Sequence, residues 1–193
     1  MPEQNNKPKV VVALYGHNDD AIKAVENQTY KNTSLYLDVA SNGRTAPTFF
    51  NDAISDKTND ADIYAFIDEN CILSPKCIEE VVNKYLWSED QFFGACYSDY
   101  SLVQDNIESN QYYFSYNLKR LKQNIINPYI FVNGQIVTRI FNEQLDTLYY
   151  YDALVKVGMN AMIYHIPKKL MTIYNTPKDI QKDIQRLSNN VRS

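Results

Sequence analysis

The chain has 193 residues, of which 45% are hydrophobic and 22% charged, and its formal net charge is −4 at pH 7. This is the composition of one soluble globular domain, and the acidic balance argues against a protein whose main task is to bind nucleic acid. The five glycines form neither a GxGxxG fingerprint nor a Walker A loop, so the two commonest phosphate-binding motifs are excluded.

The first hundred residues alternate between apolar, strand-like runs and helix-like stretches. In chain order we expect a strand over 9–14, a helix over 19–27, a strand over 34–40, a helix over 45–55, a strand over 63–67, a helix over 74–87 and a strand over 92–97. Asn18 and Ser74 are the expected N-caps of the first and third helices, and Pro47 and Pro75 suit a first helical turn. This alternation predicts an α/β fold with a mainly parallel sheet flanked by helices on both faces.

The second half has a mixed pattern. We expect a helix over 112–124, a β-hairpin over 129–139, a helix over 149–157, strands over 162–166 and 170–174, and a C-terminal helix from 177 onward. The hairpin is expected because Asn133-Gly134 lies between two β-rich runs, which is typical of a type I′ turn. Gly158 is the expected end of the helix before it.

The cysteines and the first residues of the chain indicate the cellular compartment of the protein. Cys71, Cys77 and Cys96 include no CxxC pair and are odd in number, so we expect reduced thiols rather than a disulfide framework or zinc site. The first residues lack the apolar core of a signal peptide, and no apolar run approaches the roughly 18 residues of a membrane helix. The sequence therefore predicts a cytoplasmic protein with no membrane span.

Polar side chains follow each of the four strands expected in the first half. Ligands of open α/β sheets bind beyond the carboxyl ends of the strands, which makes these residues the candidate site. They are Tyr15, Gly16, His17 and Asn18 after the first strand, Asp38, Ser41 and Asn42 after the second, Asp68, Glu69 and Asn70 after the third, and Ser98 and Asp99 after the fourth. Arg44 is the single basic residue expected near this edge, and a guanidinium can bind a diphosphate through two hydrogen bonds.

Asp68-Glu69-Asn70 is the most informative of these segments. Two oxygen-bearing side chains at positions i and i+2 of a tight turn can reach one hard cation. Such a cation could bridge the phosphates of a nucleotide and stabilise a departing diphosphate. Acidic and amide residues are also common in turns after strands, so the segment by itself leaves a plain turn open.

The order of these segments resembles the family 2 glycosyltransferases, which have the GT-A fold. The matching segments are Val10 to Asn18, Gln28-Thr29-Tyr30-Lys31-Asn32, Leu35 to Asp38, Asn51 to Ile54, Ile63 to Asn70 with Leu73-Ser74-Pro75, Leu148 to Leu154, and Ile163 to Pro167. The resemblance covers roughly residues 9 to 174. It implies one GT-A-like domain over 1–193, with a nucleotide-binding half over 9–100, an acceptor-side half over 101–176 and a C-terminal helix or tail over 177–193.

The resemblance also implies a reaction and roles for residues. A sugar would move from a nucleoside-diphosphate sugar to a hydroxyl acceptor, with inversion and with the assistance of Mg²⁺ or Mn²⁺. Asp152 would be the catalytic base, with Asp99 as the second candidate. The cation ligands would be Asp68, Asn70 and His165, and the donor nucleotide would lie against Tyr15, Asn18, Asp38 and Arg44.

Several departures from the family pattern keep alternatives open. Asn70 stands where the second aspartate of the Asp-x-Asp motif is usual, and Tyr151 replaces the acidic residue common before the base. A neutral amide binds a hard cation less strongly than a carboxylate. A non-catalytic binding or assembly protein with the same fold is therefore the alternative. A nucleotidyltransferase shares the strand–helix order, but residues 14–20 lack the glycine-rich loop that it needs.

The short chain leaves little room for a dedicated acceptor domain. We therefore expect a partner chain, a homo-oligomer or a large acceptor to complete the site.

Overall fold

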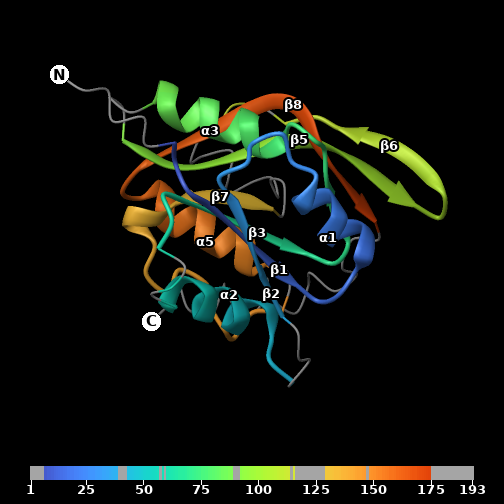
Figure 1. Cartoon of the computed structure of the whole chain (residues 1–193). Helices are drawn as coiled ribbons and strands as arrows, with labels where there is room; N and C mark the ends of the chain where they lie inside the picture. Colours follow the sequence, from blue (N-terminus) through green and yellow to red (C-terminus); the bar gives the residue numbers. More distant parts are fainter. Residues whose placement is uncertain are drawn as a thin grey trace.

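Eight strands form a single sheet with helices against it (Figure 1). The computed structural model describes residues 7–38, 43–56, 58, 60–88, 92–113, 115, 129–146 and 148–174. The elements are β1 (Val10–Tyr15), α1 (Asp19–Glu26), β2 (Thr33–Leu37), α2 (Ala46–Ser55), β3 (Ile63–Asp68), β4 (Cys71–Leu73), α3 (Cys77–Trp87), β5 (Phe93–Gln104), β6 (Ile107–Gln111), β7 (Ile130–Asn133), the 3₁₀ turn η3 (Gly134–Ile136), α5 (Tyr149–Gly158) and β8 (Met162–Tyr174).

The sheet is mixed. Its strand order is β2-β1-β3-β7-β5-β8-β4, and β6 pairs with β5. β1 is parallel to β2 and β3, and β5 is parallel to β8, whereas the β3–β7, β5–β7, β4–β8 and β5–β6 pairs are antiparallel. The α/β class is confirmed, but the expectation of a mainly parallel sheet is wrong. β7 lies between the parallel group of β1, β2 and β3 and the parallel pair of β5 and β8, and it is antiparallel to its neighbour on each side.

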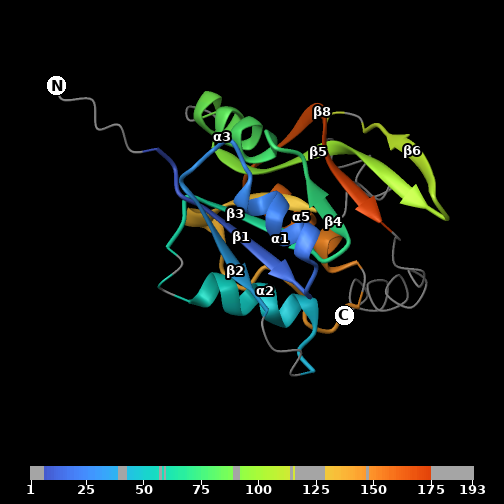
Figure 2. The same ribbon diagram turned by 45° about the vertical axis from the view of Figure 1, so that its right-hand side comes forward.

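The first three strands place helices on both faces of the sheet. The chain crosses from β1 to β2 in one direction and from β2 to β3 in the other. Since both crossovers are right-handed in proteins, the helix of each must lie on a different face. Accordingly, α1 and α2 lie on opposite sides of β1 (Figure 2).

The core on the α2 face is aromatic. Phe50 of α2 lies 5.3 Å from Phe66 of β3 and 5.7 Å from Tyr150 of α5, measured between ring centroids, so α2 and α5 share this face. β1 and β3 are buried along nearly their whole length, as their continuous apolar runs predict. The three cysteines are unpaired and buried as well.

Two of the predicted helix starts are confirmed and one is wrong. Asn18 caps α1, since its side-chain oxygen accepts the Asp20 N–H at 2.9 Å, and Pro47 lies in the first turn of α2. Ser74 does not cap α3, which begins at Cys77 with Lys76 as the N-cap residue. The preceding segment forms β4 instead, and the Ser74 N–H donates to the Leu170 carbonyl beside it. Because this segment pairs with β8, the helix begins later in the chain than the sequence predicts.

The predicted hairpin at Asn133-Gly134 is also wrong. β7 ends at Asn133, and the Gly134 N–H donates to the Asp62 carbonyl at 2.8 Å. A Cβ at Gly134 would lie 1.8 Å from the Ala61 carbonyl oxygen, so glycine is required by close approach of the backbone. The two-residue hairpin joins β5 and β6 at Asp105 and Asn106, whose φ angles of 52° and 62° have the sign that a type I′ turn requires.

The two strands predicted over 162–166 and 170–174 are one strand, β8, with irregular register opposite Ser98, Asp99 and Tyr100. Of the helix predicted over 112–124, the described residues 112, 113 and 115 are not helical. The rest of that helix and the predicted helix from 177 onward lie outside the described residues. Within the described part of the chain, no helix is both long and apolar enough to cross a membrane.

Candidate active site at the strand edge

A pocket of about 330 Å³ lies at the carboxyl ends of β1 and β3. Tyr15, the last residue of β1, is in register with Asp68, the last residue of β3, so the parallel pair brings both side chains to one edge. The other walls come from the start of α2, the β3–β4 turn and the segment around the start of α5. We call this the strand-edge pocket; its lining includes Tyr15, Arg44, Asp68, Asn70, Asp146 and Tyr149.

Two further predicted residues adjoin the pocket through its lining. The Asn18 amide donates to the Glu69 carbonyl at 2.7 Å, and Glu69 N–H donates to the Tyr15 carbonyl at 2.9 Å. Asp38, at the end of β2, lies 2.8 Å from a guanidinium nitrogen of Arg44. The predicted donor-binding residues and two of the three predicted cation ligands therefore gather at one edge of the sheet.

Glu69, in the turn after β3, restrains the conformation of the turn after β1. Gly16 has a φ of +85°, and a Cβ there would lie 2.5 Å from Glu69 Oε2. The same carboxylate accepts the His17 N–H at 3.1 Å. Only glycine both adopts this backbone conformation without strain and leaves room for Glu69.

The Asp68 carboxylate has one oxygen fully engaged. Oδ1 accepts the Tyr129 hydroxyl at 2.6 Å and the Asn70 N–H at 2.8 Å. Burial raises the pKa of Asp68 above its ordinary value, while the hydrogen bonds from Tyr129 and Asn70 act in the opposite direction. Tyr129 was missed by sequence reasoning, because nothing in its local sequence connects it to a strand end 61 positions away.

Arg44 is held by two carboxylates. Its guanidinium lies 2.8 Å from Asp38 and 3.2 Å from Asp52, and the hydrogen bond to Asp38 raises the pKa of the guanidinium. The Arg44 carbonyl in turn accepts the Tyr15 hydroxyl at 2.8 Å. The arginine therefore connects the end of β2 to the pocket wall, and the two carboxylates offset its charge.

Asp99 and His165 pair with each other away from the pocket lining. His165 Nε2 lies 2.8 Å from Asp99 Oδ1, which also accepts the Tyr113 N–H at 2.9 Å. The imidazole stacks on Tyr97 at a centroid distance of 5.1 Å. In this structure Nε2 of His165 is thus engaged by Asp99 rather than turned toward Asp68.

Two carboxylates flank the start of α5 in different surroundings. Asp152 lies within the helix, 2.7 Å from Lys156 Nζ, and Lys156 also donates to the Ile140 carbonyl. Asp146 precedes the N-cap residue Leu148 and lines the strand-edge pocket, whereas Asp152 is not part of the lining. Sequence reasoning missed Asp146, because Asp152 was predicted from the resemblance of Leu148 to Leu154 to the helix start that supplies the base in the glycosyltransferase family.

The oxygen donors of the pocket suit a hard divalent cation. Asp68, Glu69 and Asp146 bring carboxylates, Asn70 brings an amide, and Arg44 is neutralised by its own partners. Among the described residues no three His, Cys, Asp or Glu side chains gather closely enough to hold a metal by themselves. Mg²⁺ is commonly bound by one or two carboxylates together with substrate phosphates, and the donor set fits that mode.

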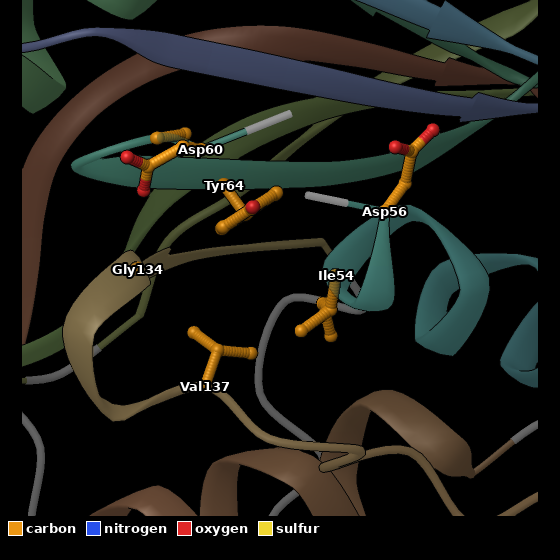
Figure 3. A pocket seen from close by; sticks show the side chains of 7 residues that line it. Ile54, Asp56, Asp60, Tyr64, Gly134 and Val137 are labelled. Carbon is orange, nitrogen blue, oxygen red and sulfur yellow. The ribbon is translucent and has the colours of Figure 1, made fainter. Parts of the chain in front are cut away.

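A second hollow, of about 360 Å³, lies at the amino end of β3 (Figure 3). Ile54, Tyr64 and Val137 surround it, and Asp56 and Asp60 lie at its border (Figure 3). None of the predicted site residues lines this hollow. It lies at the end of the strands where ligands of open α/β sheets do not usually bind.

Comparisons with known proteins give a structural likeness alone. No family model matches the chain, and no curated protein matches its sequence. Among solved structures, the chain is similar to "Crystal Structure of A197 from STIV", with 11% sequence identity and a TM-score of 0.48, over 89% of this chain and 97% of that one.

Proposed function

We propose that this chain is a glycosyltransferase of the GT-A type. It binds a nucleoside-diphosphate sugar in the strand-edge pocket and transfers the sugar to a hydroxyl acceptor with inversion. The observation that carries the proposal is the convergence of Tyr15, Arg44, Asp68 and Asn70 on one pocket, with Asn18 and Asp38 adjoining it. These residues come from four separate segments, and the sequence by itself predicts each of them as a site residue.

On the donor side, Asp38 is the residue we assign to the nucleoside. It is buried at the end of β2, and the Arg44 guanidinium offsets its charge at 2.8 Å. A carboxylate held in this way keeps acceptor capacity for a base or ribose without bringing an uncompensated buried charge. Tyr15 supplies an adjoining aromatic wall, which its hydroxyl fixes through the Arg44 carbonyl.

Asp68 and Asn70 would hold Mg²⁺ or Mn²⁺, which when bound supplies positive charge to the diphosphate as it departs. Asp68 would contribute Oδ2, since Oδ1 already accepts two hydrogen bonds, and Asn70 would contribute its side-chain carbonyl oxygen. Glu69 faces the turn after β1 and is committed to the His17 N–H. His165, the third ligand suggested by the sequence, would have to leave Asp99 to take part.

Asp146 is better placed than Asp152 to be the base. In the transfer step the acceptor oxygen forms a bond to the anomeric carbon, and the bond from that carbon to the diphosphate oxygen breaks, with its electron pair leaving on the diphosphate. The hydroxyl proton passes to a carboxylate at the pocket wall. Asp146 lines that wall, whereas Asp152 is not part of the pocket lining.

A thermal-shift experiment tests the proposal. UDP-, GDP-, CMP- and dTDP-sugars are added to the protein with and without Mn²⁺, and one of them should raise the melting temperature through binding linkage. Asp68→Ala should remove the rise. Asp60→Ala is the matched control, because Asp60 is an acidic residue at the opposite end of β3, beside the second hollow (Figure 3). A shift that survives Asp68→Ala would contradict the cation assignment.

A non-catalytic binding protein is the second candidate, and the neutral Asn70 favours it. It predicts donor binding without transfer or donor hydrolysis for every sugar nucleotide in the panel. A cytoplasmic location, and a partner chain or second copy that completes the acceptor side, stay predictions of both candidates.

A further inference from the structure

Tyr129 is held in one orientation by its surroundings. It immediately precedes β7, whose first residue Ile130 is in register with Phe66 of β3, so Tyr129 lies beside the end of that strand. Its side chain is buried, and its ring packs edge-on against Tyr150 at a centroid distance of 5.3 Å. A ring fixed by both the sheet and α5 delivers its hydroxyl to one point.

That point is Asp68 Oδ1. The Tyr129 hydroxyl donates to it at 2.6 Å, and the Asn70 N–H donates to the same oxygen at 2.8 Å. Two donors on Oδ1 restrain the rotation of the carboxylate, and the Asn70 side-chain amide is a further hydrogen-bonding neighbour of Asp68. Asp68 lines the strand-edge pocket, and Oδ2 is the oxygen that would meet a ligand there. Partners of metal-binding carboxylates act in this way, because they fix the orientation of the ligand before the metal arrives.

We infer that Tyr129 is a positioning residue, whose hydroxyl holds Asp68 so that Oδ2 alone is presented to a divalent cation in the strand-edge pocket. The inference rests on the proposed function, since it assumes the cation at Asp68. A positioning role for Tyr129 differs from a merely structural role in one measurable respect. A hydroxyl that only satisfies a buried carboxylate would change stability on removal, whereas a positioning hydroxyl would also change cation affinity.

The test is a titration of the full chain with Mn²⁺ alone. Binding is measured by electron paramagnetic resonance, as the loss of the signal of free Mn²⁺. Tyr129→Phe keeps the ring and removes the hydroxyl, and should weaken Mn²⁺ binding by about 10- to 100-fold. Tyr30→Phe is the matched control, because the Tyr30 hydroxyl donates a comparable bond, at 2.7 Å, to the Pro8 carbonyl at the amino end of β1. It should leave Mn²⁺ affinity unchanged.

The outcomes separate the inference from the proposed function. Wild type that binds Mn²⁺ through Asp68, with equal affinity in Tyr129→Phe, overturns the inference alone. Wild type that fails to bind Mn²⁺ overturns the cation site and the inference with it. Should Tyr129→Phe not fold, Mn²⁺ held at Asp68 Oδ2 must still broaden the assigned ring resonance of Tyr129 in the wild type, and an unbroadened resonance overturns the cation site at Asp68 together with the inference.

Discussion

His165 Nε2 lies 2.8 Å from Asp99 Oδ1, and the two side chains are only 8% and 6% exposed. The sequence suggested separate roles for them, one as a metal ligand and one in catalysis. The parallel pairing of β5 with β8 places Tyr97 opposite His165 and brings Asp99 to the same imidazole. Each residue therefore has the other as its hydrogen-bonding partner in a nearly dry environment.

Removal of His165 should cost stability rather than cation affinity. His165→Phe retains a ring that can stack on Tyr97 but leaves the buried Asp99 one donor short, so we expect a loss of about 2–4 kcal/mol in unfolding free energy. Urea unfolding measures this loss. His17→Phe is the control, because the exposed His17–Asp19 pair should contribute little. A folded His165→Phe with weakened Mn²⁺ binding would instead make His165 a ligand.

The two candidate bases can be separated by paired substitutions. Asp146→Asn should lower sugar transfer or donor hydrolysis by on the order of 10² or more, because a base acts in the transition state. It should keep the nucleotide-induced thermal shift. Asp152 is not part of the pocket lining, so Asp152→Asn should change turnover less than about 10-fold. The reverse ranking would restore Asp152 as the base.

Asn70→Asp should tighten Mn²⁺ binding and lower stability in the absence of metal. A second carboxylate favours a hard cation, with an expected gain on the order of 10-fold in affinity. Without metal, the new charge replaces an amide whose hydrogen bond helps to hold down the pKa of Asp68. Calorimetric titration and melting curves with and without Mn²⁺ measure the two effects. Unchanged affinity would mean that residue 70 points away from the cation.

The buried Asp68 should impose a pH dependence on stability. Burial raises its pKa in the folded chain, so its contribution to stability is fully present below about pH 3.9 and is lost as the pH rises through the folded pKa. Asp68→Asn removes this loss. Its melting temperature relative to wild type should therefore increase from pH 4 to pH 7.

Asp56 provides a control of opposite sign for this experiment. Hydrogen bonds from Thr58 lower the pKa of the Asp56 carboxyl, so its contribution is present above the unfolded pKa and is lost as the pH falls. Asp56→Asn should lose stability relative to wild type toward neutral pH. A constant difference between Asp68→Asn and wild type across this range would contradict the assignment of burial as the cause.

Glycine at position 134 should be irreplaceable, because the backbone of another segment lies where a side chain would begin. Gly134→Ala places a Cβ 1.8 Å from the Ala61 carbonyl oxygen, and we expect a loss of about 3 kcal/mol or more, or failure to fold. Asn106→Gly, at a φ of 62° in the β5–β6 turn, should be neutral or slightly stabilising. Circular dichroism melts measure both. A mild effect at Gly134 would contradict the close backbone approach.

The sequence alone determined the elements whose causes are local. The continuous apolar runs of β1 and β3, the Asn18 cap of α1 and Pro47 at the start of α2 each depend on residues within a turn or on burial of a whole strand. It also indicated much of the strand-edge pocket, because the carboxyl ends of neighbouring parallel strands necessarily share an edge. Tyr15 and Asp68 met there in register.

Only the tertiary structure decided the relationships between distant segments. Gly134 is required by the backbone of Ala61, the Asp68 carboxylate is oriented by Tyr129, and the choice between Asp146 and Asp152 depends on which one faces the pocket. β7 runs antiparallel between β3 and β5 because the folded sheet offers it an edge on each side, which no local pattern encodes. These contacts form between residues tens of positions apart, where propensity and capping have no influence and packing alone selects the arrangement.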